Sequence, residues 1–413
     1  MKTVNWERKP LGAVADLCLG KMLDQNKNRG EPLSYLANVN VRWGEFELND
    51  LRTMRFEPKE MDRYGLKFGD IVMYEGGEPG RCAIWRDQIP GMMIQKAIHR
   101  IRPKEFLDYR FLFYSFLHLG NSKVFDQYFT GATIKHLPGE NLAKVEVDIP
   151  PLPIQQRIAG ILSAYDELIE NSQRRIKILE AMARALYREW FVRFRFPGHE
   201  SVPRVPSPLG EIPQGWEVGV LGDLVQFKSG FAFKTGTFVP EGQYRLVTIK
   251  NVQDGWFLPD SDSRLDEFPE KLLAHCILEN GDILLSLTGN VGRVCLVFDA
   301  PLLLNQRVSK LVPTSSFDWA FVYCAFRDPA MRSKLEQISN GVAQQNLSPI
   351  LAARMECVLP PKEVREEFSR FAAPTIKAVV QLYAKIQNLR RTRDLLLPRL
   401  LSGQIDVDAR DHA

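Results

Sequence analysis

The chain has 413 residues, 45% of them hydrophobic and 25% charged, which leaves room for two or three domains and excludes a disordered or fibrous protein. The formal net charge is only +4, so composition alone does not establish a nucleic-acid partner. The most hydrophobic stretch, 283–304, is broken by Arg293 and Asp299, and the N-terminus has no apolar signal core, which predicts a cytoplasmic protein. The six cysteines show no C-x-x-C spacing and the histidines do not cluster, so we expect six buried thiols and no metal site.

The sequence contains an internal repeat, which sets the order of its parts. The motifs that recur 210 positions later are Trp6-Glu7 as Trp216-Glu217, Leu11-Gly12 as Leu221-Gly222, and Pro150-Pro151 as Pro360-Pro361. Between them, Gly69-Asp70-Ile71 recurs 212 positions later, which places about two extra residues in a loop of the second copy. Such a consistent return to one spacing indicates a duplicated unit.

Each copy begins with a globular part of mixed character. Strand-like β-branched and aromatic runs, such as 245–252 and 282–287, alternate with helical stretches such as 106–120, so each globular part is predicted to be α+β. After each Pro-Pro pair the apolar period becomes helical. Several prolines and glycines between the first helix and the second copy indicate an extended linker.

The predicted parts, in chain order, are a globular domain at 1–150, a helix at 151–195, a proline-rich linker at 196–215, a second globular domain at 216–360, a second helix at 361–403 and a tail at 404–413.

Both predicted helices carry an a/d heptad seam, in which spacings of four and three alternate. In the first helix the seam is Ile158, Leu162, Tyr165, Ile169, Ser172, Ile176, Leu179, Ala183, Leu186 and Trp190. In the second it is Phe368, Ala372, Thr375, Val379, Leu382, Ile386, Leu389, Arg393, Leu396 and Leu400. We expect two antiparallel coiled-coil helices of about 60 Å that separate the two domains in an internal pseudo-two-fold repeat, with a kink at Pro374. Two unlike heads at a fixed separation would suit an elongated ligand such as duplex DNA.

The sequence lacks the residue patterns expected of an enzyme. The glycine-rich segments 76–80 and 288–292 lack the lysine and hydroxyl of a phosphate-binding loop and are predicted to be hairpin turns. Segment 148–152 is a distant lookalike of the Asp-Pro-Pro-aromatic motif of base methyltransferases, but its second copy lacks both the aspartate and the aromatic residue. The first alternative is a self-sufficient nuclease or methyltransferase with fused recognition domains. It would need catalytic motifs that this sequence does not contain.

Basic and amide residues lie beside the glycine turns, and they differ between copies while the glycine, leucine and proline positions persist. Such side chains contact phosphates and base edges, and arginine is the commonest reader of guanine. The candidate DNA-contacting residues are Arg81, Gln95, Lys96, Lys135 and His136 in the first copy, and Lys250, Asn251, Asn290, Arg293, Gln306, Arg307, Gln344 and Gln345 in the second. For any one of them the alternative is a solvated loop side chain.

Local charge and apolar surface point to a partner protein. Residues 1–150 carry 22 basic and 20 acidic side chains and residues 221–360 carry 13 and 15, so we expect weak DNA binding that a partner strengthens. Apolar residues off the seam predict further helices packed on the pair: Ile161, Leu168, Met182, Phe191, Val380, Tyr383 and Leu397. The alternative is that the domains or the linker cover them.

At these motifs the sequence resembles the specificity subunit of type I restriction-modification systems. The matching segments are GATIKHL at 131–137, IPPLPIQQRI at 149–158, LGEIP at 209–213, GWE at 215–217 and LLPRLLSG at 396–403. The second junction departs from the family, because KEVREE at 362–367 replaces the usual Pro-x-x-Gln-Gln.

The resemblance implies two target-recognition domains that each read one half of a split, asymmetric DNA site, with the helices fixing the unread spacing. It further implies that two modification subunits dock on the helices and supply S-adenosylmethionine and adenine methylation, while restriction subunits add ATP-driven translocation and cleavage. This chain would perform none of that chemistry and would need no cofactor of its own. A coiled-coil scaffold whose heads bind proteins is the second alternative.

Overall fold

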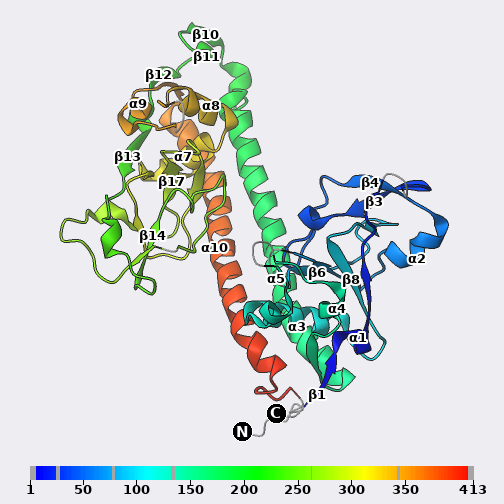
Figure 1. Ribbon diagram of the computed structural model, residues 1–413. Coiled ribbons are helices and arrows are strands. Elements are labelled where there is room, and N and C mark those ends of the chain that lie inside the picture. The colour runs from blue at the N-terminus through cyan, green and yellow to red at the C-terminus, as the bar shows by residue number, and fades with distance from the viewer. Residues whose placement is uncertain are drawn as a thin grey trace, which may run out of the picture. The chain divides into compact units, whose positions relative to one another are not determined.

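The computed structural model describes residues 6–24, 28–76, 80–131, 135–261, 263–341 and 345–407 (Figure 1). The chain divides into two compact units, Met1–Leu168 with Leu389–Ala413, and Ile169–Asn388. Each unit contains one α+β head and a part of each long helix, so both helices contribute to both units. No helix among the described residues is long and apolar enough to cross a membrane.

The two long helices are α5, Leu152–Tyr187, and α10, Lys362–Leu401. A π-helical turn, Arg188–Val192, follows α5. Every residue of the predicted seam is buried or half-buried, so the heptad pattern identified the packed face correctly. α10 continues unbroken through Pro374, which removes one backbone donor without ending the helix.

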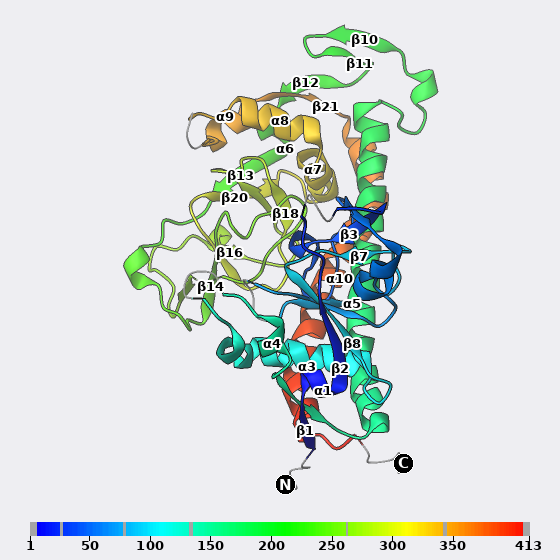
Figure 2. The same ribbon diagram turned by 45° about the vertical axis from the view of Figure 1, so that its right-hand side comes forward.

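The first head is built from two sheets and a short ribbon (Figure 2). Its main sheet has the order β2 Ala15–Leu19, β8 Ile98–Pro103, β5 Ile71–Tyr74 and β6 Cys82–Ile84, all antiparallel. The second sheet has the order β4 Arg52–Phe56, β3 Glu31–Leu36 and β7 Met93–Ile94. The ribbon pairs β1 Glu7–Pro10 with β9 Glu146–Ile149. The helices are α1 Leu11–Val14, α2 Met61–Tyr64, α3 Tyr109–Asn121 and α4 Gly139–Leu142.

The second head repeats this construction. Its main sheet has the order β13 Val225–Ser229, β20 Val308–Pro313, β17 Ile283–Ser286 and β18 Val294–Leu296. The second sheet has the order β15 Arg264–Leu265, β14 Tyr244–Val247, β19 Leu302–Leu304 and β16 Ile277–Leu278. The ribbon pairs β12 Glu217–Val220 with β21 Glu356–Leu359. The helices are α6 Leu221–Leu224, α7 Trp319–Phe326, α8 Pro329–Gln337 and α9 Pro349–Ala353.

The prediction of hairpins holds, and two other local predictions need correction. The strands on either side of both glycine-rich segments pair antiparallel, β5 with β6 and β17 with β18, as expected of hairpins. The linker is not simply extended, because β10 Arg204–Ser207 and β11 Gly210–Pro213 form a hairpin within it. Four cysteines are buried, but Cys18 and Cys357 are only half-buried, so the expectation of six buried thiols was wrong for these two.

The long helices pair in opposite directions within each unit. In the first unit, Ile158 and Leu162 near the start of α5 share a core with Leu397 and Leu400 near the end of α10. In the second unit, Phe368 near the start of α10 packs on aromatic residues of the π-helical turn that follows α5. The ring centroids of Phe368 and Phe191 lie 5.1 Å apart. These contacts are those of an antiparallel pair.

The charged seam position, Arg393, has a partner of its own. Its guanidinium lies 2.5 Å from Oδ1 of Asp166 on α5, and Oδ2 of the same carboxylate accepts a hydrogen bond from the Tyr114 hydroxyl at 2.6 Å. Burial, together with the nearby carboxylate, raises the pKa of Tyr114, so this phenol stays protonated and donates. The seam arginine therefore joins both helices to α3 of the first head.

A buried glutamine fixes the start of α5. Gln155 is 1% exposed, and its Oε1 accepts a hydrogen bond from the Asp108 N–H at 2.8 Å. Its Nε2 donates to the carbonyls of Pro150, at 2.8 Å, and Phe106, at 3.2 Å. Asp108 in turn caps α3, accepting from the Arg110 and Phe111 N–H groups, which explains why α3 begins three residues later than the predicted helical stretch.

We expect Gln155→Ala to lower the free energy of unfolding by about 1–3 kcal/mol, because three backbone groups, one buried and two partly buried, lose their partner. The neighbouring Gln156 is exposed, so Gln156→Ala should change it by less than about 0.5 kcal/mol. Urea unfolding followed by tryptophan fluorescence measures both. Equal effects of the two substitutions would show that the buried amide does not hold this junction.

Candidate nucleic-acid interface

One edge of the main sheet of the first head gathers the predicted contact residues. Because neighbouring strands run antiparallel, β2 and β5 end at this edge while β6 and β8 begin there, with Leu19 opposite His99 and Tyr74 opposite Ile98. Gln95 and Lys96 lie in the short connection between β7 and β8, and Arg81 directly precedes β6. Arg81 therefore lies on a loop that adjoins the one carrying Gln95 and Lys96.

The segment that carries Lys135 and His136 closes the same edge. The backbone of His136 pairs with both Thr130 and Gly76, so this segment lies against the end of β5. Lys135 and His136 are exposed, and Nζ of Lys135 lies 3.3 Å from a carboxylate oxygen of Asp126. All five candidates of the first copy thus lie on neighbouring loops.

Two side chains that the sequence analysis did not identify support these loops. The Arg81 guanidinium lies over the Tyr74 ring, 4.3 Å from its centroid, which fixes the direction of a half-buried arginine. His99, 1% exposed, bonds the Leu137 carbonyl at 2.9 Å through Nε2. Burial lowers the pKa of His99, so at neutral pH it is an uncharged structural residue.

The second head builds the same edge from equivalent strand ends. The Leu287 N–H donates to the Arg307 carbonyl at 3.0 Å, and the Gly289 N–H donates to the Gln345 carbonyl at 3.1 Å, which joins three loops. Asn290, Gln306, Arg307 and Gln345 are exposed on them. The structure therefore places four candidates on joined loops with exposed side chains, whereas Gln344 lies outside the described residues.

Arg293 and Lys250 border this group of loops. The guanidinium of Arg293, half-buried at the start of β18, donates to the Oε1 of Gln253, a residue that the sequence analysis did not identify. Lys250 is exposed. Its neighbour Ile249 contacts Gly289, since the isoleucine Cδ1 lies 3.7 Å from the position that a Gly289 Cβ would take. Both cations therefore lie next to the exposed loop residues.

Asn251 is a correction, because its amide is used inside the head. The residue is 3% exposed, its Oδ1 accepts from the Thr248 N–H at 2.8 Å, and its Nδ2 donates to the Leu258 and Asp260 carbonyls. The strand predicted at 245–252 ends at Val247 because this amide folds the following turn. In the first head Asn40 does the same, accepting from the Ala37 N–H and donating to the Glu47 carbonyl.

The predicted partner-binding residues divide into two groups. Four of them are buried within the chain: Phe191, Val380, Tyr383 and Leu397. For these four the alternative is correct, because other parts of the same chain cover them. The reason is packing against the heads and between the helices, since the Tyr383 ring stacks on Phe298 with centroids 4.8 Å apart. The other three are exposed on α5, namely Ile161 at 39%, Leu168 at 47% and Met182 at 59%.

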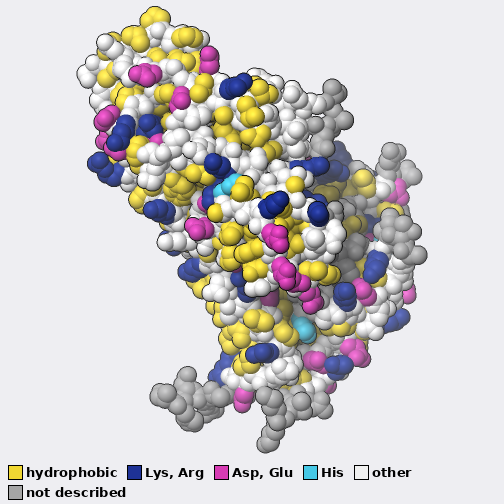
Figure 3. All heavy atoms as spheres, turned by 90° about the vertical axis from the view of Figure 1, so that its left-hand side faces the viewer, with side chains coloured by type: hydrophobic (Ala, Val, Ile, Leu, Met, Phe, Trp, Pro, Cys, Tyr) yellow, Lys and Arg dark blue, Asp and Glu magenta, His cyan; other side chains and the backbone are white. Residues whose placement is uncertain are grey.

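Charge is mixed over the surface. On the face drawn in Figure 3, lysine and arginine side chains are interspersed with acidic and hydrophobic ones. This agrees with the nearly balanced charge of the two heads. A surface of balanced charge would neutralise phosphates only weakly.

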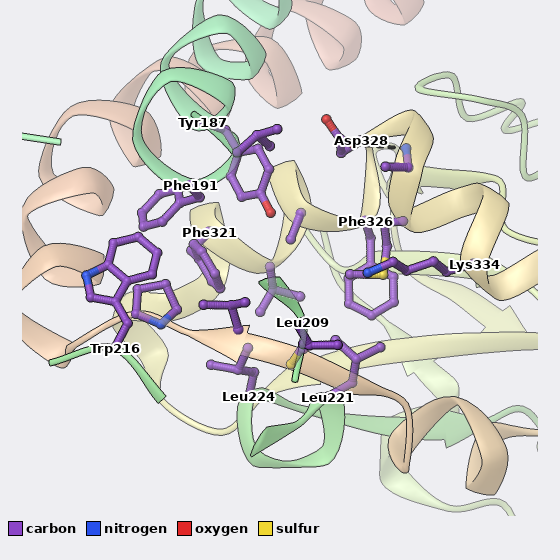
Figure 4. A pocket seen from close by; sticks show the side chains of 18 residues that line it. Tyr187, Phe191, Leu209, Trp216, Leu221, Leu224, Phe321, Phe326, Asp328 and Lys334 are labelled. Atoms are coloured by element: carbon purple, nitrogen blue, oxygen red, sulfur yellow. Dashed lines mark hydrogen bonds between the residues drawn. The ribbon is translucent and has the colours of Figure 1, made fainter. Parts of the chain in front are cut away.

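An apolar pocket of about 240 Å³ lies elsewhere in the second unit, where α7 and α8 meet the end of α5 (Figure 4). Tyr187, Phe191 and Phe321 point toward one another at one side of it. Its charged lining residues are Asp328, which caps α8 by accepting from the Ala330 N–H, and Lys334. Among the described residues no group of three histidine, cysteine or acidic side chains is placed to hold a metal. The lining of this pocket is thus largely apolar.

Comparison with known proteins identifies the class. Residues 3–181 and 213–367 match the family described as type I restriction modification DNA specificity domain. The chain is 27% identical over 347 residues to the type I restriction enzyme MjaIX specificity subunit of Methanocaldococcus jannaschii, covering 82% of this chain and 78% of that one. It is 22% identical over 330 residues to the HindI specificity subunit of Haemophilus influenzae, covering 66% and 72%.

A solved structure has the same fold. The S subunit of a type I restriction-modification system from M. genitalium aligns with a TM-score of 0.59 and 17% identity, covering 97% of both chains. The chain therefore belongs to the specificity subunits of type I restriction-modification systems. In such a system it is the non-catalytic component that recognises the DNA target.

We expect Asn251→Ala to lower the free energy of unfolding by about 2–3 kcal/mol, because buried donors and acceptors lose their partners. Lys250→Ala, at the neighbouring exposed position, should change it by less than about 0.5 kcal/mol. Urea titration of the two variants measures the difference. A stable Asn251→Ala variant would return this residue to the list of DNA-contact candidates.

Proposed function

We propose that the chain reads a split, asymmetric DNA site, with one half read by each head. The observation that supports this most is the repeated strand-end edge. The two heads share the strand order of the main sheet and its loop connections, yet they expose different side chains there, such as Lys135 in one and Gln345 at the equivalent position of the other. Equal scaffolds with unlike polar side chains are what two different base sequences require.

The long helices would set the spacing between the halves and carry two modification subunits, which recruit the restriction subunits. Ile161 and Met182, exposed on α5, support such docking because apolar side chains of this size are buried when a partner covers them. The modification subunits would supply S-adenosylmethionine and methylate adenine. The protein-binding scaffold is the competing function, and it would show no dependence on DNA sequence.

The first experiment is to co-express the chain with the methyltransferase encoded beside its gene and to map adenine methylation across the host genome by single-molecule sequencing. We expect a motif of two unlike halves with a constant number of unspecified base pairs between them, and we expect it to vanish when this chain is omitted. Absence of new methylation despite a stable complex would favour the scaffold. A continuous motif would contradict one half per head.

Gln306→Ala should relax the sequence preference in one half of that motif and leave the other half unchanged. The exposed amide lies at the strand-end edge of the main sheet of the second head, and in each head we call this edge the reading edge. Loss of a base contact costs about 1–3 kcal/mol of discrimination between base pairs. Methylome mapping of the variant measures this, with Gln156→Ala on the exposed face of α5 as the control. Equal loss in both halves would contradict reading by separate heads.

A further inference from the structure

A short segment follows the first strand of each main sheet and lies against the reading edge. In the first head this is 20–24, after β2, and in the second it is 230–234, after β13. The Lys21 N–H donates to the Ile94 carbonyl at 3.0 Å, and the Lys96 N–H donates to the Lys21 carbonyl at 2.8 Å. The segment is thereby paired with the loop that holds Gln95 and Lys96.

The second head repeats these bonds at the equivalent positions. The Phe231 N–H donates to the Leu304 carbonyl at 2.9 Å, and the Gln306 N–H donates to the Phe231 carbonyl at 3.0 Å. Both segments begin with a glycine for the same reason. A Cβ at Gly20 would lie 2.3 Å from the Gln95 carbonyl oxygen, and one at Gly230 would lie 2.4 Å from that of Asn305. Any other residue would force the segment away from the edge.

The first segment is anchored on its inner side and apolar on its outer side. Lys21 is 4% exposed, with Nζ 2.6 Å from Oε2 of Glu60. Burial alone would raise the pKa of Glu60, but its bonds to Lys21 and the Glu57 N–H lower it, so the pair stays ionised at neutral pH. The next two side chains, Met22 and Leu23, are 56% and 57% exposed.

Met22 and Leu23 are two neighbouring exposed apolar side chains close to Lys96. A ligand that contacts them would be apolar in part. DNA supplies one, because the C5-methyl group of thymine is the apolar feature of the major groove. Backbone pairing of the segment with the loop of Gln95 and Lys96, two candidate DNA-contacting residues, favours DNA over a partner protein. The exposed aromatic Phe68, 57% exposed, precedes the opposite end of β5, away from the candidate contact loops.

We propose that segment 20–24 is part of the reading surface of the first head, with Met22 and Leu23 contacting thymine methyl groups in its half-site. This inference rests on the proposed function and adds an apolar contact to the polar ones. The equivalent segment carries an exposed Ala232 beside the half-buried Phe231 on the same backbone framework. The two heads thus present different apolar shapes as well as different polar groups.

The test uses the complex of the full chain with its methyltransferase and synthetic duplexes of the mapped site, in which thymines of one half are replaced by deoxyuridine. Removal of the methyl group should slow methylation by the native complex at least about fivefold at one or more positions in the half read by the first head. Leu23→Ser should show a smaller difference in rate between the thymine and uracil duplexes than the native complex, since one of the two apolar contacts is already absent. Substitution in the other half should affect both complexes equally.

The matched control is Phe68→Ser, which removes an equally exposed apolar side chain and should retain the native sensitivity to uracil. Equal rates of the native complex on all duplexes, a half-site without thymine, or an undiminished uracil effect in Leu23→Ser would each overturn the inference. The uracil series on the native complex decides the matter even if the variant fails to assemble. Failure of the native complex to methylate any split motif would instead contradict the proposed function itself.

Discussion

One polar side chain in the first turn of each long helix, buried in the first unit and half-buried in the second, holds the head to that helix. In the first unit Gln155 bonds three backbone groups from the two segments that meet there. In the second unit Arg365 occupies the equivalent place, donating to the Pro360 carbonyl at 3.1 Å and to the carboxylate of Asp318. The residue that departs from the family pattern in sequence therefore performs the same task with a charge.

A second tie joins each head to α5 farther along the helix. The Tyr114 hydroxyl donates to Asp166 in the first unit, and the Tyr323 hydroxyl donates to Glu180 at 2.9 Å in the second. Burial raises the pKa of Glu180, so ionisation of this acid is costly. The hydrogen bond from the Tyr323 hydroxyl stabilises the ionised form. The two ties of the first head lie at separate turns of α5, whereas those of the second head lie on α10 and α5, and in each unit two separate ties restrict rotation of the head.

The sequence was sufficient for the features that repeat. A period of 3.5 residues identified the seam, and the shift of 210 identified two equal units, because burial of an apolar face constrains residue type over many positions. It was insufficient where one polar side chain serves the backbone. Asn251 resembles a DNA contact in sequence because the same residue type, asparagine, can either fold a turn or bind a base edge. The sequence does not distinguish the two roles. Gly20 and Gly230 recur at the same shift, a signal that could have identified the apolar segments.

The unlike ties at the two junctions bear on how such a chain could exchange its specificity by recombination. A crossover within Pro-Pro would separate a head from the helix residue that holds it. If the second head were joined in this way to the first helix, the Asp318 carboxylate, which is 0% exposed, would face a glutamine in place of the arginine. An unpaired buried carboxylate is strongly destabilising. Heads are therefore interchangeable as modules only when the exchanged segment extends through the first turn of the following helix.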